Sequence, residues 1–225
     1  MTPDLPVNEL FDTIQGEATW AGTHSTFVRL QGCAVGCPWC DTKHTWELDP
    51  RAERTFLEVR FKDKDAATYA LVRVPDLIGE LKHRHARHVV ITGGEPCAHD
   101  LSAVTAAIAA MGARAQIETS GTSAIRADAS AWVTLSPKLD MPGGLTVLPD
   151  SVQRADEIKM PVGKRADVDK LLAFLQAHRS NRLRQIPVWL QPLSMSRAAT
   201  AVCVEACAQH GWRLSVQTHK FIWLR

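Results

Sequence analysis

Short apolar runs alternate with amphipathic stretches along the chain, most clearly from residue 75 onward. Nearly continuous apolar runs are typical of strands that are buried on both faces of a parallel sheet. Glycine, proline and charged residues separate these runs, as expected for the turns between strands and helices. The pattern predicts strands over residues 26–30, 88–92, 115–118, 132–136, 157–160, 187–191 and 214–217.

Segments between these strands carry the spacing of amphipathic helices. For example, Leu101 and Ile108 fall on one helical face, and Gly112 follows as a stop signal. Strands that alternate with helices indicate a parallel sheet or barrel, and six or seven strands are too few to close a barrel of eight. We therefore predict an α/β fold, an incomplete parallel (β/α) barrel of about six strands. The predicted helices span residues 101–111, 167–178 and 197–210.

One stretch interrupts this alternation. Residues 47–74 are charged and only weakly periodic, and we interpret them as an insertion on the barrel with a hairpin around residues 62–67. The whole chain, residues 1–225, is predicted to form a single domain, because barrels of this size commonly fold as one unit.

Three cysteines stand close together in a loop that also contains glycine and proline. Cys33, Cys37 and Cys40 have the spacing C-x3-C-x2-C and follow a predicted strand. Four thiolates saturate a [4Fe–4S] cubane, so three thiolates without a nearby fourth would leave one iron open to a substrate or cofactor. The pattern therefore favours a catalytic iron–sulfur cluster.

Other interpretations of the cysteines stay open. The three could belong to a zinc site completed by His44 or by another cysteine, or they could be buried thiols. A disulfide framework is unexpected, because six cysteines in 225 residues is a low density for a stapled secreted fold. Cys203 and Cys207 lie four residues apart in a helical pattern, which indicates core packing.

Composition and charge limit the classes of partner. Hydrophobic residues make up 45% of the chain and charged residues 22%, as in ordinary globular proteins. The formal net charge of +2 is not that of a nucleic-acid-binding protein, and the basic residues 82–88 are interpreted as a solvated helix end. The sequence shows no apolar run long enough to span a membrane and no secretory signal. We therefore expect no nucleic-acid partner, no membrane contact and a cytoplasmic location.

Polar motifs follow the predicted strands, at the edge where a parallel barrel places its active site. After residues 88–92 comes the motif Gly93-Gly94-Glu95-Pro96. A cysteine triad and a GGE motif about one βα unit apart resemble the radical S-adenosylmethionine (SAM) superfamily. This resemblance implies a [4Fe–4S] cluster on the three cysteines, whose open iron binds SAM. It also implies that Gly94 and Glu95 hold the amino group of SAM.

Within that superfamily, the sequence resembles the 7-carboxy-7-deazaguanine synthases almost end to end, apart from residues 47–74. That family converts 6-carboxy-5,6,7,8-tetrahydropterin to 7-carboxy-7-deazaguanine with loss of ammonia, a step towards queuosine and other 7-deazapurines. Its N-terminal motif is typically QGEG, whereas Ala18 follows Glu17 in this chain. The resemblance rests on FDTIQGEATWAG (11–22), STFVRLQGC (25–33), CDTKHTW (40–46), TGGEP (92–96), ETSG (118–121), SPK (136–138), EIK (157–159), LQPLS (190–194) and SVQTHK (215–220).

The resemblance implies three groups of site residues, and it implies no protein acid or base in catalysis because the cofactors carry the radical chemistry. The first group, which binds SAM, comprises Trp39, Gly94, Glu95, Ser136, Lys138 and Gln191. The second, which binds the substrate, comprises Gln15, Glu17, Arg29, Thr92, His219 and Arg225. The third is Thr42, which follows Asp41 and is the implied protein ligand of Mg²⁺.

The residue types suit such a substrate. A pterin presents N–H donors on a guanidine-like edge, which the carboxylate of Glu17 can accept in bidentate fashion. Arg29 can pair with the carboxylate of the substrate. Other interpretations stay open for some of these residues, since Arg29 could be a surface charge, His219 a core histidine, and Asp41-Thr42 an ordinary turn.

In this family, the reduced cluster cleaves SAM, and the 5′-deoxyadenosyl radical takes a hydrogen from C6 of the substrate before its ring contracts. The resemblance therefore implies a reductase partner such as flavodoxin, and it leaves room for a homodimer. Two rival hypotheses stay open: a radical SAM activase that installs a glycyl radical on a partner protein, and a zinc-stabilised binding module without catalysis.

Overall fold

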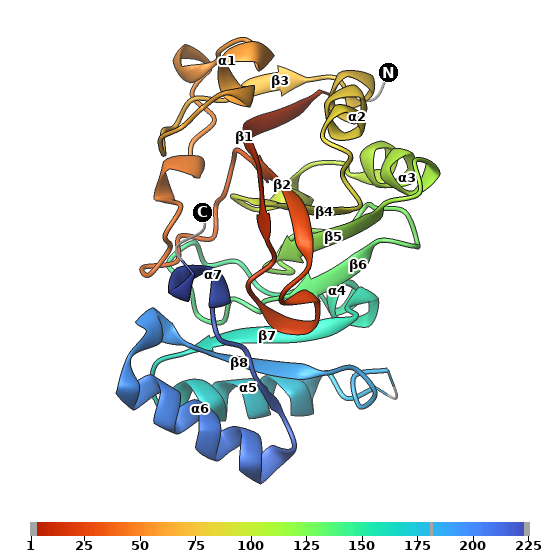
Figure 1. Ribbon diagram of the computed structural model, residues 1–225. Coiled ribbons are helices and arrows are strands. Elements are labelled where there is room, and N and C mark those ends of the chain that lie inside the picture. Colours follow the sequence, from red (N-terminus) through yellow and green to blue (C-terminus); the bar gives the residue numbers. More distant parts are fainter. Residues whose placement is uncertain (1–3, 181, 223–225) are drawn as a thin grey trace.

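A long twisted sheet forms the framework of the protein (Figure 1). The computed structural model describes residues 4–180 and 182–222. Within these ranges, the strands form one nine-stranded sheet in the order β3-β1-β2-β4-β5-β6-β7-β8-β9. The strands are β1 (Leu5–Ile14), β2 (His24–Leu30), β3 (Ala70–Val72), β4 (His88–Gly93), β5 (Arg114–Thr119), β6 (Trp132–Leu135), β7 (Glu157–Val162), β8 (Val188–Pro192) and β9 (Arg213–Leu214).

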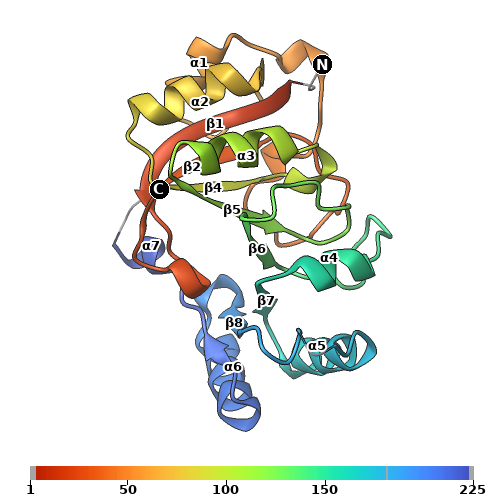
Figure 2. The same cartoon turned by 90° about the vertical axis from the view of Figure 1, so that its right-hand side faces the viewer.

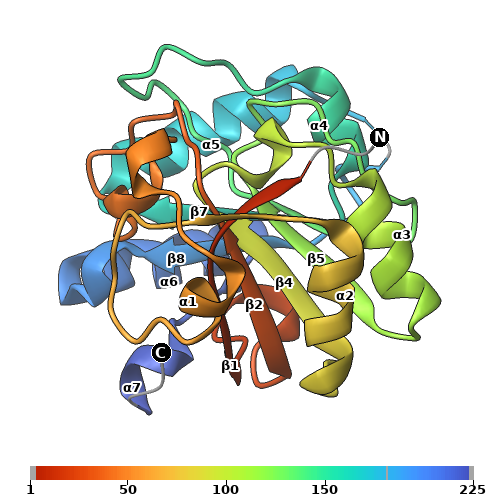
Figure 3. The same ribbon diagram turned by 90° about the horizontal axis from the view of Figure 1, so that it is seen from above.

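Most of the sheet is parallel. Strand β2 and strands β4 to β9 run in one direction, whereas β1 is antiparallel to both β2 and β3. In the described ranges, no pairing joins the two edge strands β3 and β9, so the sheet curls without closing (Figure 3). This arrangement confirms the predicted α/β fold and incomplete parallel barrel. That residues 1–225 form one domain stays a prediction.

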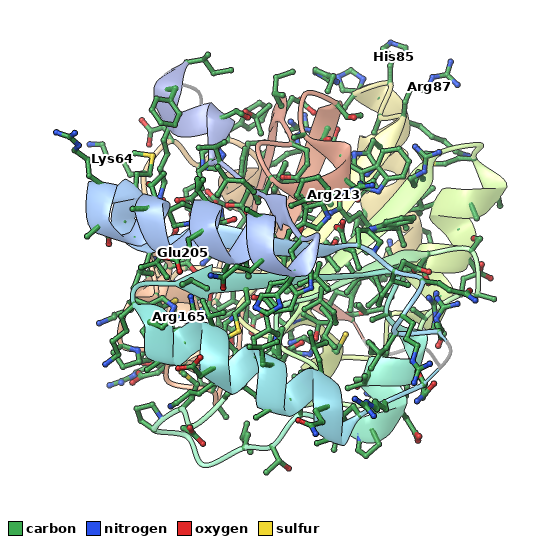
Figure 4. The ribbon with its side chains drawn as sticks, turned by 90° about the horizontal axis from the view of Figure 1, so that it is seen from below. Lys64, His85, Arg87, Arg165, Glu205 and Arg213 are labelled. Carbon is green, nitrogen blue, oxygen red and sulfur yellow. The ribbon has the colours of Figure 1, made fainter. Side chains whose placement is uncertain are left out.

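Helices cover the outer face of the curled sheet. Helix α3 packs against β5 and α2, helix α5 packs against β7, and helix α6 packs against β7 and β8 (Figure 2). Arg165 of α5 faces Glu205 of α6 in an ion pair of 3.1 Å (Figure 4). None of the helices in the described part of the chain is both long and apolar enough to cross a membrane. The helices are α1 (Phe56–Arg60), α2 (Val74–His83), α3 (Ser102–Ala110), α4 (Pro149–Arg154), α5 (Arg165–Ala177), α6 (Arg197–His210) and α7 (Thr218–Phe221).

The apolar core divides into two clusters between the sheet and the helices. One cluster includes Leu77 of α2 and Ile91 of β4, and the other includes Ile158 of β7 and Leu190 of β8. Val90 and Ile91 are adjacent in β4, so their side chains point to opposite faces, and both are buried. Burial on both faces explains why the strand reads as a continuous apolar run.

Strand β1 is not predicted by the apolar pattern, because buried polar residues interrupt it. Asn8 and Glu9 lie in the middle of the strand and are 0% and 1% exposed. Asn8 donates hydrogen bonds to Gln31 Oε1 at 2.7 Å and to the carbonyl of Ala66 at 2.9 Å. Glu9 pairs with Arg29 at 2.5 Å. Specific tertiary partners therefore compensate the burial of polar groups that the apolar pattern does not assign to a strand.

The hairpin expected around residues 62–67 is wrong. Lys62 Nζ donates to Asn8 Oδ1 at 2.8 Å and to the carbonyl of Thr68 at 3.0 Å, so the segment folds as an irregular loop around one ammonium group. Before this loop, Thr55 and Glu58 form a capping box at the start of α1. After it, β3 pairs with β1, so this part of the chain completes an edge of the sheet.

The basic residues 82–88 are only partly a solvated helix end. Arg84 forms ion pairs with two carboxylates, and His88 is 2% exposed at the start of β4. His85 and Arg87 do point away from the protein surface (Figure 4). Because some of these residues are paired or buried, only a small basic surface is exposed.

The last described segment joins the β9 edge of the sheet to the loop after β1. Strand β9 is shorter than predicted, because the chain then leaves the sheet and bonds to the loop after β1. Gln217 Nε2 donates to Glu17 Oε1 at 2.7 Å, and Thr218 N donates to the carbonyl of Gly16 at 3.0 Å. Helix α7 therefore lies beside the end of β1 (Figures 1 and 3). Arg225, predicted to contact the substrate, lies outside the described residues.

Candidate active site

Two adjoining cavities lie within the barrel and at the carboxyl ends of its parallel strands, where such barrels bind ligands. The main cavity has a volume of about 370 Å³ and contains the cysteine loop. The second cavity has a volume of about 200 Å³ and lies towards β1. Because they have walls in common, ligands in the two cavities would be neighbours. Both are lined by Glu17, Arg29, Asp41, Thr42, Thr92, Glu118, Lys159 and Gln217.

The three predicted cluster cysteines all line the main cavity. Backbone hydrogen bonds fix their loop, since Gly32 N donates to Thr45 O at 2.7 Å and Cys33 N donates to Trp46 O at 2.9 Å. Trp46 Nε1 also donates to Cys40 Sγ at 3.4 Å. Hydrogen bonds to ligating sulfurs are one of the means by which proteins tune iron–sulfur clusters. The loop therefore has both the ligands and the surroundings of a cluster site.

The thiols of the cysteine loop must lose their protons before they can bind a metal. Burial raises the pKa of the Cys33 and Cys37 thiols, although the ammonium of Lys138 opposes this for Cys37. Cluster assembly must therefore release their protons. Within the described ranges, no three His, Cys, Asp or Glu side chains converge to hold a single metal ion. Because a cubane has irons at separate corners, thiols spread around a cavity fit a cluster better than one zinc ion.

The glycines of the GGE motif let the end of β4 approach the cysteine loop. A Cβ atom at Gly93 would lie 2.2 Å from the carbonyl oxygen of Leu30, and one at Gly94 would lie 2.2 Å from that of Gly32. Gly94 N and Glu95 N donate to these same two carbonyls, at 2.9 Å and 2.8 Å. A side chain at either glycine would break this contact.

Glu95 is 4% exposed, and neighbouring groups fix the direction of its carboxylate. It accepts hydrogen bonds from Thr119 Oγ1 at 2.6 Å and from Cys97 N at 3.0 Å. It also accepts from the hydroxyl of Ser120 and from the backbone N–H of Ser120, the latter at 2.8 Å. The end of β5 therefore holds Glu95 in the wall of the main cavity.

The remaining predicted SAM residues line the same cavity. Lys138 Nζ donates to Ser136 Oγ at 2.6 Å, and burial lowers the pKa of Lys138. Gln191 is 8% exposed at the end of β8, and Trp39 is 41% exposed beside the cysteines. The structure thus brings all six predicted SAM residues together around one cavity.

A buried group of charged residues lies where the two cavities meet. Lys159 Nζ, on β7, lies 2.5 Å from Glu17 Oε2 and 2.6 Å from Glu118 Oε2. We call Glu17, Lys159 and Glu118 the ionic triad. Gln217 donates to the other oxygen of Glu17 at 2.7 Å, and Gln116 donates to the other oxygen of Glu118 at 2.9 Å.

The two carboxylates of the ionic triad differ in acidity. Burial alone would raise the pKa of Glu17, but Lys159 and Gln217 stabilise the charged form and lower this pKa to about 2. Burial raises the pKa of Glu118, and Lys159 only partly opposes the effect. Burial would lower the pKa of Lys159, yet the two carboxylates raise it. Glu17 and Lys159 are therefore both charged at neutral pH.

Other predicted substrate residues line the second cavity. Arg29 pairs through Nε with Glu9 at 2.5 Å, is 17% exposed and lies beside Thr92 on the neighbouring strand, so it is not a surface charge. His219 packs against the loop after β1, where a Cβ atom at Gly16 would lie 2.1 Å from His219 Nδ1. Burial lowers the pKa of His219.

Gln15 also lines the second cavity, but its side chain is bonded to the protein. Its Nε2 lies 3.2 Å from Gln116 Oε1 and 3.5 Å from Glu118 Oε1, and its Oε1 accepts from Glu17 N at 3.2 Å. Thr42 lines both cavities, with Oγ1 at 3.5 Å from Cys40 Sγ. Its position connects the cysteine loop with the substrate-facing wall.

Comparisons with known proteins agree with this geometry. A family model described as a 4Fe-4S single cluster domain matches residues 15–140. The 7-carboxy-7-deazaguanine synthase of Escherichia coli (strain K12) is 45% identical over 219 residues, which cover 96% of this chain and 97% of that protein. The synthase of Buchnera aphidicola subsp. Schizaphis graminum is 40% identical over 222 residues, which cover 98% of this chain and 99% of that protein.

A solved structure is similarly close. The crystal structure of QueE from Escherichia coli matches with a TM-score of 0.91 at 44% identity, over 95% of this chain and 94% of that chain. The chain belongs to the 7-carboxy-7-deazaguanine synthase family. It is therefore a radical SAM lyase, with a [4Fe–4S] cluster and SAM as cofactors. Membership of this family decides against the glycyl-radical activase and the zinc-stabilised module.

Several residues of this synthase-family site have no role predicted from the sequence. Glu118 and Lys159 are the most informative of them, because they are charged residues inside buried strands. Burying a charge is costly unless it is paired, so such residues signal a specific partner. The signal was present in the sequence, but the partners become apparent only when the fold brings β5, β7 and the loop after β1 together. The other unassigned residues that line the site include Trp46, Thr119, Ser120 and Gln217.

Proposed function

We propose that this protein converts 6-carboxy-5,6,7,8-tetrahydropterin to 7-carboxy-7-deazaguanine with release of ammonia, as a step in the biosynthesis of queuosine and other 7-deazapurines. The observation that carries the proposal is the junction of two cavities, of which the main one is lined by three cysteines, with the ionised Glu17 in the wall that both share. A cofactor in the main cavity and a substrate in the second would meet at this junction.

In the main cavity, the three cysteines would hold the cluster. When bound, the cluster and SAM supply a carbon-centred radical that abstracts hydrogen from the substrate. Glu95 and Gly94 would bind the amino group of SAM, and the hydrogen bonds from Thr119 and Ser120 keep the Glu95 carboxylate in place. The other residues proposed to bind SAM are Trp39, Ser136, Lys138 and Gln191.

In the second cavity, Glu17 would accept the N–H donors on the guanidine-like edge of the pterin. Its low pKa supports this role, because an acceptor must be ionised to receive two N–H bonds. Arg29 would pair with the substrate carboxylate, with Thr92 beside it on β4. Gln15 positions Glu17, and His219 closes the cavity from α7. Arg225 stays a predicted contact.

We also propose a Mg²⁺ site at Thr42. A hydroxyl group together with substrate oxygens and water suits this ion, which keeps several of its waters. The position of Thr42 in the wall of both cavities supports the assignment. Partners and location are proposals of the same kind: a one-electron reductase such as flavodoxin as donor, a homodimer, and a cytoplasmic location.

The proposed function is tested by turnover without air. Reconstituted protein is incubated with carboxytetrahydropterin, SAM, a low-potential reductant and Mg²⁺, and the products are analysed by mass spectrometry. We expect 7-carboxy-7-deazaguanine and one equivalent of ammonia, and a slower reaction when Mg²⁺ is chelated. Cleavage of SAM without any change in the pterin would contradict the proposed substrate.

A further inference from the structure

The ionic triad contains a charge that the proposed roles leave unexplained. One ammonium faces two carboxyl groups, of which Glu17 is ionised, and the side chains of Lys159, Glu17 and Glu118 are 8%, 15% and 13% exposed. An uncompensated charge in such a place is costly unless a ligand neutralises it or donates hydrogen bonds to it. The triad is therefore suited to a ligand edge that carries N–H donors.

We infer that Lys159 is a positioning residue for the substrate, which fixes the Glu17 carboxylate at the junction of the two cavities so that the site accepts the donor edge of a pterin. This inference rests on the proposed function. Lys159 acts through Glu17 and performs no step of the reaction itself.

The origin of each residue in the fold supports this assignment. Glu17 belongs to the loop after β1, whereas Lys159 lies in the interior of β7, paired with Trp189 of the neighbouring strand. A strand inside a sheet is held more rigidly than a loop. Lys159 Nζ and Gln217 Nε2 each bond one oxygen of Glu17, at 2.5 Å and 2.7 Å. The direction of the loop carboxylate is therefore set by the strand and by the last described segment.

The positioning role of Lys159 predicts a measurable change in the pH dependence of substrate binding. The titratable groups that act on Glu17 are Lys159, the imidazole of His219 and Glu118, and Lys138 acts in turn on Lys159 and Glu118. Glu157 acts on Glu118 in addition. If the ammonium is removed, Glu17 and Glu118 repel each other, and the pKa of Glu17 rises. Binding of the donor edge then needs a pH above that raised pKa.

The experiment measures the Kd of carboxytetrahydropterin for the anaerobic holoenzyme without SAM, so that no turnover occurs, between pH 6 and pH 9. Four proteins are compared: the wild type, Lys159→Met, Lys159→Arg, and the double variant Lys159→Met with Glu118→Gln. Visible absorption of the cluster and the Kd of SAM are measured for each as controls.

We expect the wild-type Kd to be nearly independent of pH. For Lys159→Met, the Kd should be weaker by about tenfold or more at pH 6.5 and should recover as the pH rises. Lys159→Arg should restore much of the affinity because it restores the charge. The double variant should bind more tightly than Lys159→Met at pH 6.5, because the amide removes the repulsion. Cluster absorption should not change, and the Kd of SAM should change much less than the Kd of the pterin.

A Lys159→Met variant with wild-type affinity at all pH values would overturn the inference, and so would a double variant that binds more weakly than Lys159→Met. If Lys159→Met does not fold, Lys159→Gln takes its place, and wild-type affinity of Lys159→Gln for the pterin at pH 6.5 would overturn the inference. A wild type that neither binds nor converts the pterin would overturn the proposed function together with the inference, whereas an active wild type with an unaffected Lys159→Met would overturn the inference alone.

Discussion

Two buried cysteines show how the surroundings of a side chain decide its role. Cys37 is 8% exposed and lines the main cavity, whereas Cys203 is 0% exposed on the core-facing side of α6. A ligand can reach the first thiol and not the second. The sequence already distinguishes them, since Cys37 has two cysteine neighbours in a glycine-containing loop and Cys203 has helical spacing.

Replacing Cys37 should therefore remove the cluster. In Cys37→Ala, we expect loss of visible absorption and of turnover together, because three thiolates are needed to hold the cubane. Cys203→Ala is the matched control, and it should keep both properties with a small loss of stability from the cavity it leaves. Iron content, absorption and product formation check this. An active but colourless Cys37→Ala would contradict the cluster assignment.

The GGE glycines provide a second test at single residues. In Gly94→Ala, the added Cβ atom would lie 2.2 Å from the carbonyl oxygen of Gly32, so the cysteine loop must move. We expect poor cluster retention and a Kd for SAM weaker by about tenfold or more, since the Gly94–Gly32 contact joins the two motifs. Gly79→Ala in α2 is the control, because a Cβ atom there has no close neighbour. It should stabilise the protein by up to about 1 kcal/mol.

The same measurements on the two glycine variants can also contradict the prediction. Gly94→Ala with normal iron content and normal SAM affinity would show that the close approach of β4 to the cysteine loop is not required for the site.

At the residue scale, motifs could be predicted and supporting partners could not. The cysteines and the GGE motif are local patterns, so their cavity-lining positions follow from the sequence. Lys159 has its role because positions 17, 118 and 159 meet in space. No local pattern contains that information, although a charged residue in a buried strand indicates that some partner exists.

Among the secondary-structure elements, buried parallel strands were the most predictable. Strand β4 reads as an unbroken apolar run because both its faces are covered, whereas β1 contains Asn8 and Glu9, whose partners lie in distant segments. Helix α1 could have been predicted, since Thr55 and Glu58 have capping-box spacing. The hairpin expected after it was wrong because Lys62 organises that loop instead.

Segment α1–β3 should contribute to stability and not to chemistry. Thr55 Oγ1 accepts from Glu58 N at 3.3 Å at the start of α1, away from both cavities. Thr55→Ala should lower the free energy of unfolding by about 1 kcal/mol and leave KM and kcat unchanged. Thr55→Ser is the matched control and should keep the cap. A changed KM in Thr55→Ala would give this segment a role in the active site.

Considered as a whole, the molecule should lose stability in mild acid, partly through His88. Burial, with the nearby Arg114, lowers the pKa of His88 from 6.5 to about 4. The unfolded chain therefore takes up a proton near pH 6.5 that the folded protein refuses until about pH 4. The contribution of the neutral histidine to the free energy of unfolding is fully present above pH 6.5. It decreases by roughly 3 kcal/mol as the pH falls towards 4.

Urea unfolding followed by tryptophan fluorescence at pH 7.5, 5.5 and 4.5 measures how the free energy of unfolding depends on pH. His88→Asn, which can still bond to Ser25, should be less stable at pH 7.5 and should show a shallower loss between pH 6.5 and 4. Glu17 acts at lower pH, since its contribution is present above the usual 4.5 and is lost as the pH falls towards 2. Equal slopes in the wild type and His88→Asn would contradict the assignment to His88.

The most direct test of the whole account is an anaerobic crystal structure with SAM and carboxytetrahydropterin, with data collected at the iron absorption edge. We expect the anomalous iron signal in the main cavity, bound to Cys33, Cys37 and Cys40, and the donor edge of the pterin at Glu17 in the second cavity. Iron bound elsewhere, a cluster with a fourth protein ligand, or a pterin turned away from Glu17 would contradict it.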